Sequence, residues 1–229
     1  PDIEWNWRSF HQYVDRLAEA KPAVNVASLV AHGNLRLLAL GMENRPPTAR
    51  ELDEMKVMLG KTMLEGAFGL STGLIYPPCV YAHTTELVEL CKVTAEYDGV
   101  FVVHMRNEGD QLLESIREVA SVGMEAGIPV HISHFKASGR QNWGKVEDAL
   151  RALEMYRSEG IDMTFDQYPY TAGSTFLSSL LPVWVHEGGT MKMLERLRKE
   201  DARRRIAAEM SEKGRGRDWS WDNLLITSI

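Results

Sequence analysis

Apolar residues along the first 170 positions follow two alternating patterns. Short runs rich in Val, Ile, Leu and Phe predict buried strands, whereas longer stretches with apolar groups at helical spacing predict amphipathic helices. Strands are predicted at 23–30, 67–73, 99–104, 129–134 and 161–168. Helices are predicted at 7–20, 48–63, 84–97, 112–124 and 145–158. The chain therefore alternates strands with helices.

Turn and capping signals separate these elements. Lys21-Pro22 ends the first predicted helix, because proline cannot continue it. Thr48 and Glu51 have the spacing of a capping box, so a helix is expected to begin there. The polar stretch Ala-His-Gly-Asn at 31–34 resembles a turn, and it would carry His32 just past the end of the first predicted strand.

Strand ends recur at a regular interval. Ser71, His104, His134 and Asp166 lie near the ends of four predicted strands and follow one another at 33, 30 and 32 residues. A repeated βα unit of this length requires a parallel sheet, either open and doubly wound or closed as a (β/α)8 barrel. No Gly-x-Gly-x-x-Gly or Gly-x-x-x-x-Gly-Lys loop follows a strand, which favours the barrel. A complete barrel has eight strands, so we expect an α/β fold that is a partial TIM barrel.

The regular interval ends at Tyr170. A loop rich in Ser, Thr and Gly at 171–179 is followed by two charged helices predicted at 190–212. We therefore divide the chain into a partial barrel at 1–170 and a helical, loop-rich insertion at 171–229. The chain begins at Pro1 and stops inside an apolar run at Ile229, so we expect an internal fragment of a longer protein.

Composition excludes several classes of partner. The 229 residues are 44% hydrophobic and 25% charged, enough to bury a sizeable core. A net charge of -6 and the lack of a dense basic cluster argue against a nucleic-acid or anionic membrane surface. No apolar run approaches the roughly 18 residues that cross a bilayer. Two cysteines without Cys-x-x-Cys spacing predict neither a disulfide framework nor a zinc knuckle, and a reducing, cytoplasmic location is expected.

Two histidines carry the main chemical prediction. His104 and His134 end consecutive strands, and adjacent strand ends in a barrel are close enough for two imidazoles to share a metal ion. The alternative is a pair of hydrogen-bonded histidines near loops, with no metal. Catalytic zinc usually has three protein ligands plus water, so a further ligand would be required.

Other histidines and cysteines are weaker candidates. His32 could join the same rim or be a turn histidine hydrogen-bonded to backbone. Cys79 could be a soft metal ligand or a small apolar filler. His131 lies three residues before His134, so it is expected on the other side of its strand, packed beneath a helix. Cys91 lies on the apolar face of a predicted helix and is expected in the core.

Polar side chains next to these strand ends could bind a substrate. Lys136 would project to the same side as His134, where its ammonium suits a substrate carboxylate, although it could also be a solvated surface lysine. Tyr168 ends the last predicted strand and Ser174 follows it, and both could donate hydrogen bonds to an oxyanion or acyl oxygen. The alternative for the Tyr-Pro-Tyr segment at 168–170 is an aromatic plug at the barrel rim.

Four motifs in this order and spacing resemble those of a known family. They are Phe68–Tyr76, His104–Glu108, Ile132–Lys136 and Asp166–Ala172. Together they are similar to the N-acyl-D-amino-acid deacylases, or D-aminoacylases, of the amidohydrolase superfamily. The similarity extends along nearly the whole chain, including Asn25–Gly33.

The resemblance implies a zinc-dependent barrel that lacks the first, second and eighth strands. It implies that His104 and His134 are the metal histidines that close the fifth and sixth strands. It also implies that Lys136, Tyr168 and Ser174 hold the substrate carboxylate and acyl region, with Tyr168 as a catalytic residue that polarises the scissile carbonyl. Residues 171–229 would then be the family's insertion after its seventh strand.

Several family residues have no counterpart at the matching places. The family has a His-x-His or His-x-Asp pair on the first strand, a cysteine ligand on the second and an aspartate general base on the eighth. Cys79 falls in the wrong motif to be that cysteine, and Asp222 lies in the tail rather than in a strand. We therefore expect one or two zinc ions in the intact protein but weak zinc binding and no activity in these 229 residues alone.

The expected reaction is zinc-dependent hydrolysis of an N-acyl-D-amino acid to a carboxylate and a D-amino acid. One alternative is a cyclic-amide amidohydrolase, similar to hydantoinase or dihydroorotase. Another is a non-catalytic relative that kept the barrel and lost the metal. The partner is thus a small-molecule substrate, and because a partial barrel leaves two exposed sheet edges, the fragment is also expected to self-associate.

Overall fold

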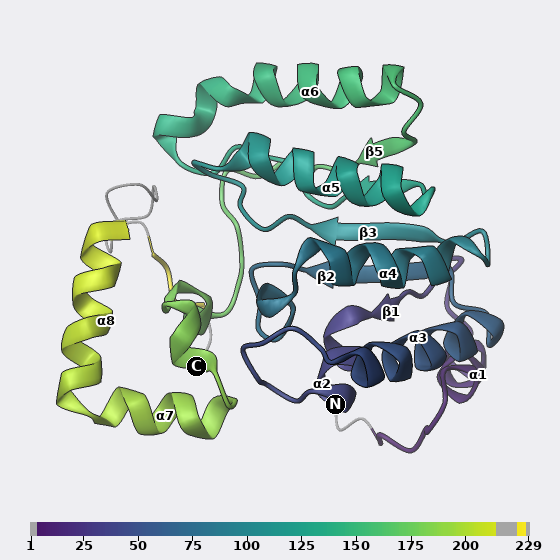
Figure 1. Ribbon diagram of the computed structural model, residues 1–229, viewed down its shortest axis with the longest axis horizontal. Coiled ribbons are helices and arrows are strands. Elements are labelled where there is room, and N and C mark those ends of the chain that lie inside the picture. Colours follow the sequence, from purple (N-terminus) through teal and green to yellow (C-terminus); the bar gives the residue numbers. More distant parts are fainter. Residues whose placement is uncertain (1–3, 214–223, 228–229) are drawn as a thin grey trace.

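The fold is one parallel sheet with helices on one side (Figure 1). A computed structural model describes residues 4–213 and 224–227. Five strands pair in sequence order, namely β1 (Val30–Ala31), β2 (Gly69–Gly73), β3 (Val100–His104), β4 (Val130–Ile132) and β5 (Met163–Phe165). The α-helices are α1 (Phe10–Glu19), α2 (His32–Ala39), α3 (Ala49–Leu64), α4 (Thr84–Ala95), α5 (Leu112–Ala126), α6 (Val146–Ser158), α7 (Thr190–Arg198) and α8 (Glu200–Lys213). Five parallel strands and the helices between them confirm the predicted α/β architecture.

The capping and spacing signals in the sequence correctly predict the start and the buried face of α3. The Thr48 side chain accepts a hydrogen bond from the Glu51 backbone N–H, and the Glu51 side chain accepts from the Thr48 backbone, so the capping box of α3 is confirmed. Inside α3, Met55 and Leu59 are completely buried, as helical spacing predicts. On α5, by contrast, the apolar spacing continues to Met124 and predicts its burial, but the side chain is exposed.

The first predicted strand is mostly not a strand. Only Val30 and Ala31 pair with β2, while Val24 and Val26 are exposed. The backbone first reaches the sheet when Ser28 accepts a hydrogen bond from the Phe68 N–H. The predicted turn at 31–34 is also wrong, because His32 begins the helix α2. This short edge strand therefore passes directly into a helix.

Alternation along the strands gives the sheet a helix-covered face and an open face. Phe101 and Val103 of β3 are completely buried on the side of the helices. Val102, His131 and Thr164 form one row across β3, β4 and β5 on the opposite side, and none of the three is buried. We call this opposite side the concave face. The prediction that His131 packs beneath a helix is wrong, because Val130 and Ile132 take the helix side of β4.

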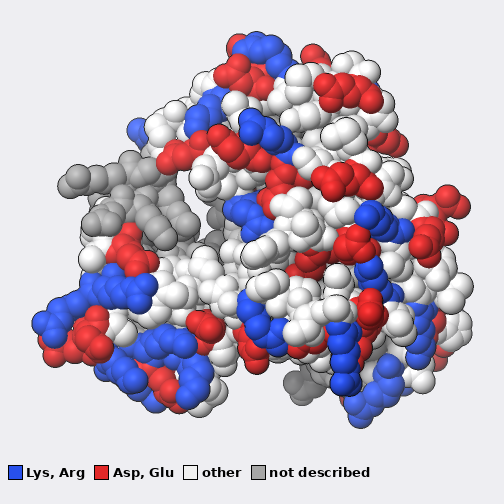
Figure 2. Space-filling model, viewed as in Figure 1, with Lys and Arg blue, Asp and Glu red and all other residues white. Residues whose placement is uncertain are grey.

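The segment after β5 has no further described strand. Four-residue 3-10 helices at Leu177–Leu180 and Val183–His186 lead into α7 and α8, which match the two predicted charged helices. Figure 1 shows α7 and α8 set apart from the helices that cover the sheet. Among the described helices, none is long and apolar enough to cross a membrane. On the face in Figure 2, acidic and basic side chains are interspersed.

Candidate metal centre

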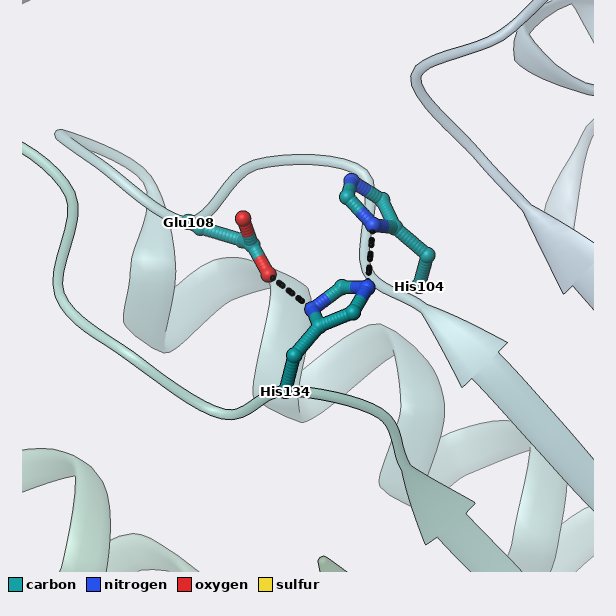
Figure 3. Close-up of side chains that lie close together, drawn as sticks. All are labelled: His104, Glu108 and His134. Atoms are coloured by element: carbon teal, nitrogen blue, oxygen red, sulfur yellow. Dashed lines mark hydrogen bonds and ion pairs between the residues drawn. The ribbon is translucent and has the colours of Figure 1, made fainter. Parts of the chain in front are cut away.

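The ends of β3 and β4 bring two histidines together. His104 is the last residue of β3, and His134 follows β4 by two residues. Val103 pairs with Ile132, and the Val103 carbonyl accepts a hydrogen bond from the Ser133 N–H. The two chain segments therefore stay adjacent beyond the end of β4. Nδ1 of His104 lies 2.8 Å from Nε2 of His134 (Figure 3). The predicted pair is therefore formed by the fold.

Glu108 completes this group, although no role was predicted for it. Its Oε1 lies 3.0 Å from Nδ1 of His134 and 2.7 Å from Nζ of Lys136. Lys136 also donates to the His134 carbonyl oxygen at 2.9 Å. Ligand atoms of His104, Glu108 and His134 all lie within 4.8 Å of one another, which is compact enough to hold a metal ion. Glu108 lies four residues after His104 and ends the His104–Glu108 motif, and this position was the sequence signal that could have identified it.

The electrostatics of His104 favour a metal ligand. Burial, followed by the nearby charges of His134 and Lys136, lowers the pKa of His104 to about 3. The ring is therefore neutral at physiological pH, the form that binds metals. In the described part of the chain, its buried Nε2 has no hydrogen-bond partner. A buried nitrogen without a partner requires an explanation such as a bound ion.

Asp166 holds the backbone of His134. His134 has a φ of 42°, in the left-handed region, which is uncommon for a residue other than glycine. One carboxylate oxygen of Asp166 accepts a hydrogen bond from the His134 N–H at 2.6 Å, and the other lies 2.9 Å from Nε2 of His131. Partial burial raises the pKa of Asp166, but these two hydrogen bonds outweigh it and the pKa lies below its ordinary value. Asp166 is therefore ionised at neutral pH.

Two tyrosines border the group. The Tyr168 ring centre lies 6.4 Å from that of His134 and 5.5 Å from Nζ of Lys136. Burial and the charge of Glu108 raise the pKa of Tyr168, so its hydroxyl stays protonated and can donate. The Tyr76 ring lies 5.4 Å from His104. Tyr76 had no predicted role, although it ends the first of the four motifs.

Ser174 is not part of this group. Its side chain is exposed, and the neighbouring Thr175 reaches the rim instead, with Oγ1 2.9 Å from the Tyr76 hydroxyl. A Cβ added to Gly173 would lie 3.5 Å from the Tyr168 hydroxyl, so the loop passes close to that oxygen. Lys136 and Tyr168 thus lie at the metal group, while Ser174 lies beside it on the loop.

His32 and Cys79 belong to a separate buried cluster. His32 is completely buried, with Nε2 2.7 Å from Glu86 and Nδ1 2.8 Å from Thr72, so it is neither a rim ligand nor a turn histidine. Burial raises the pKa of the Cys79 thiol, but hydrogen bonds from His32, Thr72 and the Gly73 N–H outweigh it and the pKa lies below its ordinary value. Cys79 is buried in the hydrophobic core cluster, as the apolar-filler alternative predicts, and it is not a member of the metal group.

Cys91, like Cys79, is a free cysteine in the hydrophobic core, but the pKa of its thiol shifts in the opposite direction. It is completely buried in the hydrophobic core, as predicted. Burial alone raises the pKa of its thiol far above the ordinary value. The thiol is therefore protonated at any physiological pH, and Cys91 acts as a packing residue.

Comparisons with known proteins show which family this chain resembles. No family model matches the chain. D-aminoacylase from Alcaligenes xylosoxydans xylosoxydans is 35% identical over 173 residues, which is 76% of this chain and 36% of the relative. N-acyl-D-glutamate deacylase from the same organism is 39% identical over 165 residues, 72% of this chain and 34% of the relative. The chain therefore spans about a third of the length of these relatives.

Solved structures show the same relationship. The crystal structure of N-acyl-D-glutamate deacylase from Bordetella bronchiseptica, complexed with zinc and a phosphonate mimic of the tetrahedral intermediate, matches with a TM-score of 0.68 and 37% identity. The match covers 71% of this chain and 34% of that one. The chain belongs to the N-acyl-D-amino-acid deacylase family. A D-aminoacylase crystal structure matches similarly, with a TM-score of 0.69 and 36% identity over 72% of this chain and 35% of the other.

Membership of the deacylase family places the five strands in the larger fold. The solved deacylases are amidohydrolase barrels, and the chain matches only part of each. The five parallel strands therefore form part of a (β/α)8 barrel, which confirms the predicted fold class. His104, Glu108 and His134 lie at the carboxyl ends of the strands, the end where barrel enzymes place their active sites.

Proposed function

We propose that the full-length protein hydrolyses the amide bond of N-acyl-D-amino acids and that His104 and His134 bind its catalytic zinc. The observation that carries this proposal is the neutral His104 ring at the catalytic end of a deacylase-family sheet. Its Nδ1 lies 2.8 Å from Nε2 of His134, and its buried Nε2 has no partner among the described residues. The zinc in the homologous N-acyl-D-glutamate deacylase supports the choice of metal.

The donor set fits zinc. Two imidazole nitrogens and a carboxylate oxygen are ligands that zinc binds readily, and a catalytic zinc site keeps one position for water. Glu108 can serve in either of two ways. It can bind the ion directly, or it can accept the Nδ1 proton of His134 and so orient Nε2 of that ring toward His104. In both cases the side chain of Glu108 belongs to the metal centre.

The surrounding side chains suit the substrate. Bound zinc would lower the pKa of a water molecule and polarise the scissile carbonyl. We assign Lys136 to the substrate carboxylate, because its ammonium lies at the rim and already pairs with a carboxylate, that of Glu108. Tyr168 remains protonated and donates a hydrogen bond to the carbonyl oxygen. Ser174 is assigned to the acyl region from its place on the adjoining loop. The family pattern assigns the proton transfers to an aspartate for which this sequence has no counterpart.

The assay uses the full-length protein with zinc supplied. N-acyl-D-amino acids with apolar and acidic side chains are compared with their L-enantiomers and with hydantoin and dihydroorotate. We expect turnover of the D-enantiomers and none of the cyclic amides. Ring opening as the main activity would favour the cyclic-amide alternative. A protein that binds no zinc when purified without chelator would favour the non-catalytic one.

The 229 residues alone make a second test. We propose that they bind zinc weakly and do not turn over substrate, because the family's cysteine ligand and aspartate base have no counterpart at the matching places. Turnover by this chain with zinc added would contradict that proposal. We further propose that residues 171–229 are the insertion after the seventh barrel strand; Asp222 lies outside the described residues.

Association and location complete the proposal. β1 and β5 are the edges of the described sheet, and exposed edges pair readily with another chain. We propose that the 229-residue chain self-associates through them; a monomeric mass at high concentration, measured by light scattering, would contradict this.

Two free, buried cysteines support a reducing, cytoplasmic location.

A further inference from the structure

A histidine and an aspartate on the concave face lie next to the metal group without belonging to it. Nε2 of His131 is 2.9 Å from the Asp166 carboxylate, and Nδ1 of the same ring is 2.8 Å from the Thr164 hydroxyl. His131 comes from β4, whereas Thr164 lies in β5 and Asp166 follows that strand. The imidazole thus bridges two adjacent strands and has a partner on each of its nitrogens.

Asp166 forms backbone hydrogen bonds with residues before and after His134. Its backbone N–H donates to the Ile132 carbonyl at 3.1 Å, and its backbone carbonyl accepts from the Phe135 N–H at 2.9 Å. Between these two bonds, its side chain accepts the His134 N–H at 2.6 Å. Three hydrogen bonds from one residue therefore determine the path of the turn that carries His134.

This turn needs such support. The φ of 42° at His134 is a conformation that L side chains adopt at a cost, and it persists only where the surroundings impose it. The turn also sets the direction of the His134 ring, because it interrupts the alternation of side chains after Ile132. A turn free to relax would move the imidazole away from His104 and Glu108.

His131 joins β4 to β5 and also contacts the residue that holds the His134 turn. It is half-buried on the concave face, outside the hydrophobic core and outside the group of three potential metal ligands. Its contact with Asp166 is its link to the metal centre. We propose that His131 and Asp166 are positioning residues that hold metal ligand His134 in its left-handed turn and thereby set the metal affinity of the site. This inference rests on the proposed metal-binding role of His104 and His134.

The test compares metal affinity with stability in the full-length protein. Zn²⁺ and Co²⁺ are titrated into the metal-free wild type and into the variants Asp166→Ala, His131→Leu and His131→Gln. Ser71→Ala is the matched control, because Ser71 occupies the same row of the concave face. Within the described residues its side chain makes a single hydrogen bond, to the Val30 carbonyl. Thermal unfolding of each metal-free variant and the visible spectrum of its Co²⁺ form are recorded in parallel.

We expect Asp166→Ala to weaken metal binding by about tenfold or more, the usual scale for lost outer-shell partners. His131→Leu should weaken it less, and His131→Gln should restore much of it, since the amide can still donate to Asp166. The Co²⁺ spectrum should change in Asp166→Ala and His131→Leu. Ser71→Ala should behave like the wild type. If Asp166→Ala does not fold, the pair His131→Leu and His131→Gln carries the test.

Three outcomes would overturn the inference. Wild-type affinity and an unchanged Co²⁺ spectrum in both Asp166→Ala and His131→Leu would show that the turn needs no such support, while the metal site itself stands. Equal losses in His131→Leu and His131→Gln would show that the hydrogen bond to Asp166 is irrelevant. A wild-type protein that binds no metal would refute the proposed function as well.

Discussion

Two regions of this molecule contain the same three chemical groups, a histidine bonded to a glutamate that is also bonded to a cation. We call them the rim triad (His134, Glu108 and Lys136) and the buried triad (His32, Glu86 and Arg36). In the buried triad, the histidine and arginine side chains are 0% exposed and the glutamate is 2% exposed. In the rim triad, the histidine and lysine are 29% and 27% exposed.

The two triads differ in whether a nearby imidazole nitrogen lacks a hydrogen-bond partner. Both nitrogens of His32 are hydrogen-bonded, to Glu86 and Thr72, so the buried triad ties α2, β2 and α4 together. Two nitrogens of the described residues are buried without a partner, Nε of Arg36 in the buried triad and Nε2 of His104 beside the rim triad. The guanidinium nitrogen of Arg36 only donates, whereas the imidazole of His104 can bind a metal ion. The same groups therefore stabilise the fold where they are enclosed, and they form a candidate binding site where a neighbouring imidazole nitrogen has no partner.

The largest predicted effect on stability is at Glu86. Removing its carboxylate leaves the charge of Arg36 buried without compensation, which typically costs about 3 to 5 kcal/mol. We expect Glu86→Ala to lower the free energy of unfolding by that amount in urea titrations. Glu108→Ala is the matched change in the rim triad and should have a much smaller effect. Equal losses at the two positions would contradict the distinction between the triads.

Metal binding should show the opposite ranking. Glu108→Ala removes either a ligand or the orienting partner of His134, and the loss of an orienting partner typically weakens metal affinity about 10 to 100-fold. Zinc titration of the metal-free full-length protein measures this change. His32→Gln, in the buried triad, should bind zinc like the wild type. Unaltered affinity in Glu108→Ala would remove Glu108 from the metal centre.

The buried triad also predicts a pH dependence. Burial lowers the pKa of His32, but hydrogen bonds to Cys79 and Glu86 outweigh it and the pKa is raised. Because the folded-state pKa is raised, the stability contributed by His32 is fully present below the unfolded pKa of about 6.5 and is lost as pH rises through the folded pKa. Stability measured against pH should lose this component in His32→Gln. An unchanged profile would mean that His32 stays neutral.

The two cysteines should titrate on opposite sides of the ordinary thiol pKa. The pKa is lowered at Cys79, next to His32, and raised at Cys91 in the core. Thiolate absorbance at 240 nm during a pH titration, in Cys79→Ser and Cys91→Ala, separates the two groups. We expect the rise below the ordinary pKa to disappear only in Cys79→Ser. Its persistence in that variant would place the low-pKa thiol elsewhere.

The smallest predicted effect is at an exposed ion pair. Arg50 and Glu54 lie one turn apart on α3 with 89% and 49% of their side chains exposed. Water and salt screen such a pair, and its contribution to stability is usually slight. We expect Arg50→Ala to leave the urea midpoint unchanged within error. A loss comparable to that of Glu86→Ala would show that burial is not what separates these pairs.

Periodic features of the fold were predictable from the sequence. The spacing of Ser71, His104, His134 and Asp166 correctly predicted parallel strands, and the strand-end position of His104 and His134 correctly predicted that they meet. Both predictions depend on local pattern and on the geometry that parallel strands share. The capping box at the start of α3 was predictable for the same reason.

Features that depend on tertiary contacts were not predictable from the sequence. Gly33 and Asn34 disfavour a helix, yet burial of His32, Leu35 and Arg36 selects α2 over the predicted turn. The face of His131 was misassigned because simple alternation was extended to His134, although the strand ends at Ile132 and a left-handed turn follows.

The role of Glu108 was missed for a related reason. Its contacts with His134 and Lys136 join residues 26 and 28 positions apart in the chain. No local pattern of apolar and polar residues encodes such contacts between loops. The position of a polar residue four places after a strand-end histidine indicates a candidate site residue but does not predict its contacts.

Anomalous diffraction at the zinc absorption edge tests the central claim most directly. Crystals of the full-length protein grown with zinc should give a peak within bonding distance of ring nitrogens of both His104 and His134, with Glu108 beside it. No zinc peak should lie at His32. Zinc bound elsewhere, with the His104 and His134 rings still hydrogen-bonded to each other, would contradict the assignment of these histidines as metal ligands.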